Sequence, residues 1–170
     1  MLNIPSIWRW PARFPGGQVS QSLVSHLDIP PTLLNLAGVE VPEYGPPFMK
    51  GIPQPEAERQ MAAWPGRSLT PQLTGEADSV QDAIVIENDE DYIGLRLRTL
   101  VTDTHQLTVY VGDDGEQDYG ELFDTQNDPG QLRNLWHDPN VQELKRDLKT
   151  RLMEELIRTD NRMPRRQSHA

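Results

Sequence analysis

Histidine is the residue type that exchanges protons near neutral pH without a large shift of its pKa, and this sequence contains four histidines. They are His26, His105, His137 and His169, and no two of them have the i, i+4 spacing with which helical histidines hold a metal. Catalysis would also require a partner that orients the imidazole, and the pattern indicates none. The histidines are therefore predicted to have surface or helix-capping roles.

Two acidic runs could supply oxygen ligands to a hard cation, residues 87–91 and residues 113–118. In an EF-hand the glycine follows acidic or amide ligands at alternate positions, whereas Gly115 follows the sequence YVGDD. Solvated hairpin tips are the favoured interpretation of both runs. No metal site is predicted.

Arg96 and Arg98 are the residues whose spacing fits anion binding. In a strand, residues two apart project from the same face, and paired guanidinium groups can hold a sulfate or phosphate bidentately. A solvated outer face of an antiparallel sheet accounts for them equally well, so both interpretations stay open. Glycine-rich phosphate loops do not occur, which leaves nucleotide binding unsupported.

The composition excludes several other classes of protein. The 170 residues include 26 acidic and 16 basic side chains, giving a formal charge of -10, and no cysteine. Disulfide scaffolds, thiol catalysis and cysteine zinc sites are excluded, and the acidic total argues against nucleic-acid binding. Because no apolar run reaches the roughly 18 residues of a membrane span, we expect a soluble chain without a membrane segment. The cellular compartment stays open.

The first half is predicted to be part of an α/β core. Residues 4–11 favour a short strand, and residues 29–37 favour a helix that Asp28 caps and Gly38 ends. Residues 40–66 are rich in proline and glycine and predict a long loop, in which only residues 56–64 could form helical turns.

The second half is predicted to be a small antiparallel sheet packed against a C-terminal helix. Apolar residues run over 83–87 and alternate over 93–102 and 107–111, with a short strand expected at 121–123 and a turn at 127–130. Asp138 and Pro139 then begin an amphipathic helix. The expected organisation is residues 1–81, residues 82–160 and a flexible tail over 161–170, in an α/β to α+β fold.

Short segments spread over nearly the whole chain share their order and spacing with a known family. They are residues 4–11 (IPSIWRWP), 24–39 (VSHLDIPPTLLNLAGV), 66–69 (GRSL) with Leu73 and Gly75, 98–103 (RTLVTD), 107–110 (LTVY), 121–124 (ELFD), 127–130 (NDPG) and 134–135 (NL). Together they resemble the C-terminal part of the sulfatases, which are formylglycine-dependent sulfuric-ester hydrolases of the alkaline-phosphatase superfamily. The resemblance implies the tail of a sulfatase-type α/β domain followed by the small sheet.

The family's catalytic groups have no counterpart in this sequence. Its nucleophile arises from Cys or Ser in a Cys/Ser-x-Pro-Ser/Ala-Arg motif, but the chain lacks cysteine and none of its seven serines has proline two places later. The family's aspartate and other metal ligands and its catalytic lysines lie upstream of the segment that residues 4–11 resemble. The resemblance therefore implies no catalytic residue and no cofactor in this chain, while the parent enzyme would use formylglycine and calcium or magnesium.

Substrate contacts are implied by position alone. In the family, the region before Gly66 and the segment over 87–98 border the substrate cleft, so Glu87, Asn88, Arg96 and Arg98 are the candidate substrate-binding residues. Residues 104–106 (THQ) depart from the aromatic residue and lysine that relatives commonly have, so no substrate role is carried over to that turn.

Three hypotheses about function remain. The first is the C-terminal portion of a sulfatase, inactive alone, whose partner is a missing N-terminal half or a second copy and whose parent acts on a sulfated small molecule or glycan. The second is a noncatalytic module that binds an anionic sugar or a partner subunit. The third is a decayed gene fragment. Under the first, the end of the chain around residues 4–8 would expose apolar surface.

Overall fold

The computed structural model describes residues 4–39, 65–90, 92, 94–111 and 119–159. The chain divides into two compact units, Met1–Gln81 and Asp82–Ala170, called the N-terminal and the C-terminal unit below. The predicted helical turns over 56–64, nearly all of the loop over 40–66 and the tail over 161–170 lie outside the described residues.

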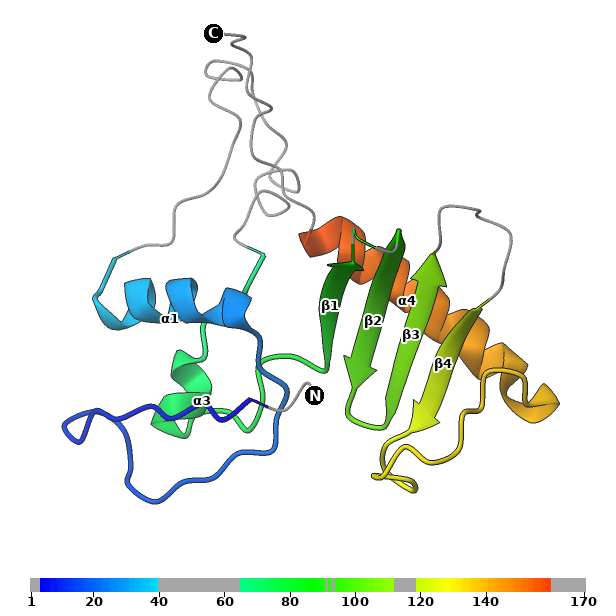
Figure 1. Ribbon diagram of the computed structural model, residues 1–170. Helices are drawn as coiled ribbons and strands as arrows, with labels where there is room; N and C mark the ends of the chain where they lie inside the picture. Colours follow the sequence, from blue (N-terminus) through cyan, green and yellow to red (C-terminus); the bar gives the residue numbers. More distant parts are fainter. Residues whose placement is uncertain (1–3, 40–64, 91, 93, 112–118, 160–170) are drawn as a thin grey trace, which may run out of the picture. The chain divides into compact units, whose positions relative to one another are not determined.

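The C-terminal unit contains a four-stranded antiparallel sheet (Figure 1). Its strands are β1 (Ala83–Glu90), β2 (Leu95–Thr102), β3 (His105–Val111) and β4 (Tyr119–Asp124), paired in chain order. The predicted antiparallel sheet is therefore confirmed. Successive side chains along each strand point to opposite faces of the sheet, which is the origin of the period-two alternation in the sequence.

Helix α4 (Gln142–Thr159) packs across one face of this sheet (Figure 1). A short 3-10 turn, Pro139–Val141, precedes it, and the Asp138 side chain accepts the backbone N–H of Asn140 at 2.9 Å. The predicted helix start at Asp138 and Pro139 is therefore confirmed. Leu148 and Leu152 of α4 are buried against the sheet.

The core of this unit centres on Trp136, which is fully buried between β4 and α4. Around it lie the inward-facing leucines of three neighbouring strands, Leu100, Leu107 and Leu122. The ammonium groups of Lys145 and Lys149 lie 4.7 and 4.6 Å from the centre of the Trp136 ring. Trp136 thus contributes apolar area to the core and a cation–π surface to the two lysines.

The N-terminal unit contains the 3-10 turn η1 (His26–Asp28), helix α1 (Ile29–Leu36) and helix α3 (Thr70–Thr74) (Figure 1). The predicted helix is confirmed, and Gly38 ends it with a φ of 72°, in the left-handed region that glycine favours. The backbone N–H of Val39 then donates to the Leu34 carbonyl at 2.9 Å.

The predicted capping role of Asp28 is wrong in its detail. The Asp28 side chain makes no capping hydrogen bond to α1 but completes a capping box with Ser25 around η1, one turn earlier. Its carboxylate accepts the Ser25 N–H at 2.7 Å, the Arg67 N–H at 2.8 Å and the Gln81 side-chain amide at 2.8 Å. Asp28 therefore joins three segments of the unit and is itself buried.

The predicted strand over 4–11 does not form, because residues 4–10 have no assigned secondary structure. A strand requires a hydrogen-bonded neighbour, and the described part of the chain provides none for this segment. Its apolar side chains Ile4 and Ile7 are exposed, as the sequence predicts.

Within the described residues, no helix has the length and apolar character needed to cross a membrane.

Candidate functional site

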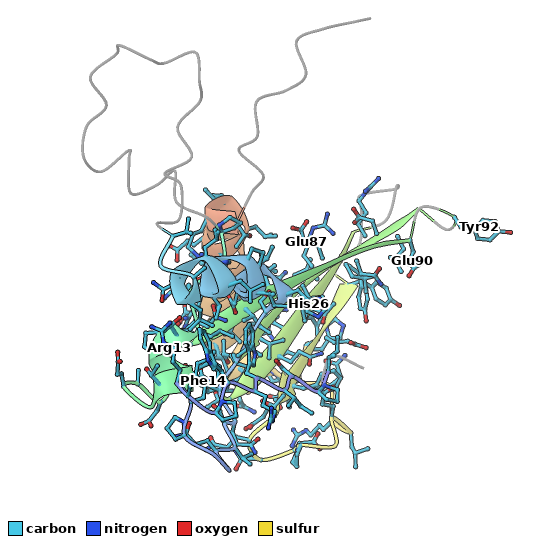
Figure 2. All side chains as sticks on the ribbon, turned by 90° about the vertical axis from the view of Figure 1, so that its left-hand side faces the viewer. Arg13, Phe14, His26, Glu87, Glu90 and Tyr92 are labelled. Atoms are coloured by element: carbon cyan, nitrogen blue, oxygen red, sulfur yellow. The ribbon has the colours of Figure 1, made fainter. Side chains whose placement is uncertain are left out.

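Four charged side chains meet near the tip of the β1–β2 hairpin and form what we call the hairpin cluster: Glu87, Asp89, Arg96 and Arg98. The strand register places Glu87 opposite Arg98 and Asp89 opposite Arg96. Arg98 contacts Asp89 at 2.7 Å and Glu87 at 3.2 Å, and Arg96 contacts Asp89 at 3.2 Å. Figure 2 shows Glu87 on this hairpin, with Glu90 and Tyr92 closer to its tip.

Three of the four predicted substrate-binding residues are thus brought together, while Asn88 is not. Alternation along β1 turns Asn88 to the opposite face, where its amide donates to Glu90 at 3.3 Å. In the sequence, Asp89 is visible only as part of the acidic run over 87–91, although it pairs with both arginines. The antiparallel register, once fixed by the turn, is the signal that would have identified it.

The two arginines differ in how firmly they are held. The Arg98 side chain is 23% exposed and is bonded to both carboxylates, whereas the Arg96 side chain is 52% exposed. The hydrogen bond from Arg98, together with the positive charges of both arginines, lowers the pKa of Asp89, although desolvation opposes this. The same hydrogen bond raises the pKa of Arg98.

This arrangement presents donors and acceptors side by side. Two guanidinium groups and two carboxylates balance in charge, so an incoming anion must compete with Asp89 for the arginines. Hydroxyl groups can bind without that competition, because they both donate and accept. The hairpin cluster is therefore chemically better suited to hydroxyl groups than to a free anion.

We expect the Asp89 pKa to rise more in an Arg98→Ala variant than in an Arg96→Ala variant, because the Arg98 hydrogen bond is the largest cause of its depression. Because the pKa of Asp89 is lower in the folded state, its ionised carboxylate stabilises the fold at pH values above its ordinary pKa of about 3.9. This stabilisation is lost as the pH falls through the folded-state pKa. Carboxyl NMR titration measures both shifts. Asp124, whose pKa is lowered mainly by Asn127, serves as the internal control and should not move. Equal shifts in both variants would contradict this assignment.

The described histidines occupy surface positions, in line with the roles expected of them. His26 and His137 are exposed, and His105 begins β3 with its ring Nδ1 2.8 Å from the Thr104 hydroxyl. His169 lies outside the described residues.

The implied divalent cation does not fit the residues of this chain that the structure describes. Nowhere among them do three or more His, Cys, Asp or Glu side chains gather in a way that could hold a metal ion. The hairpin cluster offers two carboxylates, but both are occupied by arginines. No catalytic step through a metal is assigned to this chain.

A hollow of about 860 Å³ is a second feature, located in the N-terminal unit. Its walls combine apolar residues of the segment before η1, including Ile4, Ile7 and Phe14, with Leu69 and Leu73 of the α3 region. Arg13 holds this segment to the end of α1, since its guanidinium donates to the Leu36 carbonyl at 2.9 Å. Polar and apolar atoms contribute about equally to its walls, which carry no cluster of titratable groups.

The matched family model and the fold both identify the chain as the C-terminal part of a sulfatase. The chain belongs to the family described as N-sulphoglucosamine sulphohydrolase, C-terminal, whose match covers residues 1–158. The resemblance stated from the sequence is therefore confirmed.

Individual relatives agree with this assignment. The chain is 29% identical over 153 residues to the Delta 4,5-hexuronate-2-O-sulfatase of Bacteroides thetaiotaomicron, covering 85% of this chain and 26% of that protein. A putative sulfatase from the same species is 26% identical, with a TM-score of 0.57 over 79% of this chain and 25% of the other.

One further solved structure supports the fold. A protein in complex with its substrate D-glucosamine-2-N,6-O-disulfate superimposes with a TM-score of 0.70 at 22% identity. The match covers 94% of this chain and 29% of that one. The chain thus spans between a quarter and three tenths of the length of the relatives that it matches.

Proposed function

We propose that this chain acts as the C-terminal portion of a sulfuric-ester hydrolase, supplying scaffold and one side of the substrate cleft. The observation that carries the proposal is the family match over residues 1–158 in a chain that spans only 26% of its curated relative. The nucleophile and metal ligands would belong to the part of the sulfatase fold that this chain does not span. Formylglycine and calcium or magnesium would be supplied there.

The substrate class that we propose is a sulfated saccharide. One relative is named as a hexuronate sulfatase and a structural neighbour was solved with a sulfated glucosamine. The hairpin cluster supports this class, since its carboxylates can accept hydrogen bonds from sugar hydroxyls and its guanidinium groups can donate to them. Arg96 and Arg98 would contact the substrate, with Glu87 fixing the Arg98 guanidinium. Asn88 would contribute from the other face of β1 only if the substrate wraps around the hairpin edge.

The alternative is a noncatalytic module that binds an anionic sugar by itself. The ion pairs of both arginines argue against this binding module, because a free anion gains little binding energy where the cationic charge is already balanced.

Co-expression tests the proposed function. The chain would be produced with the portion of the Bacteroides hexuronate-2-O-sulfatase that it does not match, and release of sulfate from a sulfated unsaturated disaccharide would be measured. We expect turnover by the purified pair and none by either part alone. Failure of the two parts to assemble would contradict the proposal, and salt-sensitive binding of sulfated glycan by the chain alone would favour the binding module.

Within that pair, we expect Arg98→Ala to raise KM by about tenfold, the loss of roughly one charge-assisted hydrogen bond. Arg133→Ala is the matched control, because Arg133 is also paired with an aspartate, Asp138 at 2.9 Å, but lies outside the hairpin. An unchanged KM for Arg98→Ala would remove the hairpin cluster from the substrate site.

A further inference from the structure

The tip of the β1–β2 hairpin carries an aromatic side chain that buries none of its surface. Tyr92 is 100% exposed, the largest fraction among the exposed large hydrophobic residues that the structure describes. Figure 2 shows its ring beyond Glu90, projecting away from the sheet. Single exposed apolar residues are common on protein surfaces. It is the position of Tyr92, next to the hairpin cluster, that indicates a function.

The two strands of the hairpin are paired right up to this tip. Glu90 lies opposite Leu95, the last pair before the turn, and the ion pairs of the hairpin cluster join the strands directly below that pair. Gly94 leads into β2 with a φ of 63°, in the left-handed region that glycine favours. A ligand on Tyr92 therefore binds at the end of a paired ladder, which lowers the entropic cost of binding compared with a long loop.

Tyr92 lies within reach of a ligand that contacts the hairpin cluster. It follows Asp89 by three positions, so the backbone between the two residues spans at most about 10 Å. A saccharide of more than one ring that contacts Asp89 or Arg96 can therefore extend to the tip.

The chemistry of a tyrosine ring suits a sugar ring. Tyrosine offers a flat apolar face together with a polar hydroxyl, and it has only two side-chain torsions to order upon contact. A sugar ring presents C–H groups on its face and hydroxyls around its rim. The C–H groups can lie on the Tyr92 ring while a hydroxyl donates to a carboxylate close by, such as the exposed Glu90.

The charge around the tip argues against other classes of ligand. Glu87, Asp89 and Glu90 oppose the approach of nucleic-acid phosphates and of anionic lipid headgroups. A protein partner buries about 800 Å² on each side around a centre depleted of charge, whereas Tyr92 follows a strand end rich in carboxylates. Since the same carboxylates repel a sulfate group, the sugar that lies on Tyr92 is expected to carry none.

We propose that Tyr92 forms a second sugar subsite at the hairpin tip, where its ring stacks on an unsulfated sugar of a longer, sulfated saccharide. The inference rests on the proposed function and narrows its substrate class to oligosaccharides. Tyr92 is thereby a specificity-determining residue, which contacts the substrate away from the sulfate ester.

Two substrates of different length test the subsite in the co-expressed pair described above. One is the sulfated unsaturated disaccharide, and the other is a tetrasaccharide that ends in the same sulfated sugar and has no further sulfate. Because Tyr92 buries none of its surface, Tyr92→Ala should fold like the native chain. Tyr119→Ala is the matched control, since Tyr119 is 63% exposed but begins β4, outside the hairpin.

We expect Tyr92→Ala to raise KM for the tetrasaccharide about fivefold, and to leave KM for the disaccharide and both kcat values within about twofold. Tyr92→Phe should keep the native KM for the tetrasaccharide, because stacking needs the ring and not the hydroxyl. Equal effects of Tyr92→Ala on the two substrates, or no effect on either, would overturn the subsite and leave the proposed function intact. An equal loss in Tyr119→Ala would also overturn it.

A pair without turnover would contradict the proposed function, and the subsite is then decided on the full chain alone. NMR of isotope-labelled tyrosine rings would follow the addition of the tetrasaccharide, and the signal absent from Tyr92→Phe identifies Tyr92. We expect the Tyr92 signal to shift saturably while the Tyr119 signal stays in place. A Tyr92 signal that does not move would overturn the subsite.

Discussion

Gly120→Ala is expected to destabilise the C-terminal unit by roughly 3 kcal/mol, at the upper end of the range for overpacked cores. A Cβ atom at Gly120 would overlap the six-membered ring of Trp136 and the backbone carbonyl oxygen of Thr108. The ring cannot retreat easily because it is fully buried within the core. The carbonyl belongs to β3, whose pairing with β4 fixes its position.

Native-state hydrogen exchange of amides in β3 and β4 measures this loss as a fall in protection of roughly a hundredfold. Gly130→Ala is the matched control, since its Cβ would make only ordinary contacts, the nearest at 3.4 Å to Leu132. That variant should stay within about 0.5 kcal/mol of the native chain. Equal protection in the two variants would show that the ring and β4 do not pack as described.

Asp28→Ala is expected to have the largest effect on the N-terminal unit, a loss of about 3 kcal/mol or more. The buried carboxylate accepts three hydrogen bonds, two of which reach across 39 and 53 residues to Arg67 and Gln81. Alanine would leave these donors without their acceptor in a site closed to water, and each stranded donor costs about 1 to 3 kcal/mol. Asp28→Asn should recover only part of the loss, because its amide nitrogen cannot accept.

Exchange of the Ser25 and Arg67 amides reports this change directly, since both N–H groups donate to Asp28. We expect their protection to collapse in Asp28→Ala, while amides of the C-terminal unit keep theirs. Asp78→Ala is the control, as Asp78 is exposed in the same unit. Retained protection at Arg67 would mean that Asp28 does not join these segments.

The elements that the sequence predicted well are those set by local chemistry. Three features depend only on residues that are close in the sequence: the alternation over β2 and β3, the helix cap at Asp138 and the end of α1 at Gly38. The local sequence is therefore sufficient to predict each of them. The segment over 4–11 shows the opposite case. Its residues favour extended backbone, but a strand also requires a hydrogen-bonded partner, and the described residues provide none for this segment.

Contacts between distant residues account for what the sequence did not reveal. The role of Asp28 depends on Arg67 and Gln81, which the chain reaches only after folding. Likewise, the contact of Gly120 with Trp136 has no periodic signature, although both are central to the core. In the hairpin cluster, Arg96 and Arg98 were predicted to share a face, while Asp89 required the register of β1 against β2.

The central claim is that this chain carries the scaffold of a sulfatase without its attacking group. Its most direct test is the release of inorganic sulfate from an aryl sulfate by the purified full-length chain, with calcium or magnesium present. We expect no release above the rate in buffer. Sustained turnover that follows the concentration of the purified chain would contradict the claim.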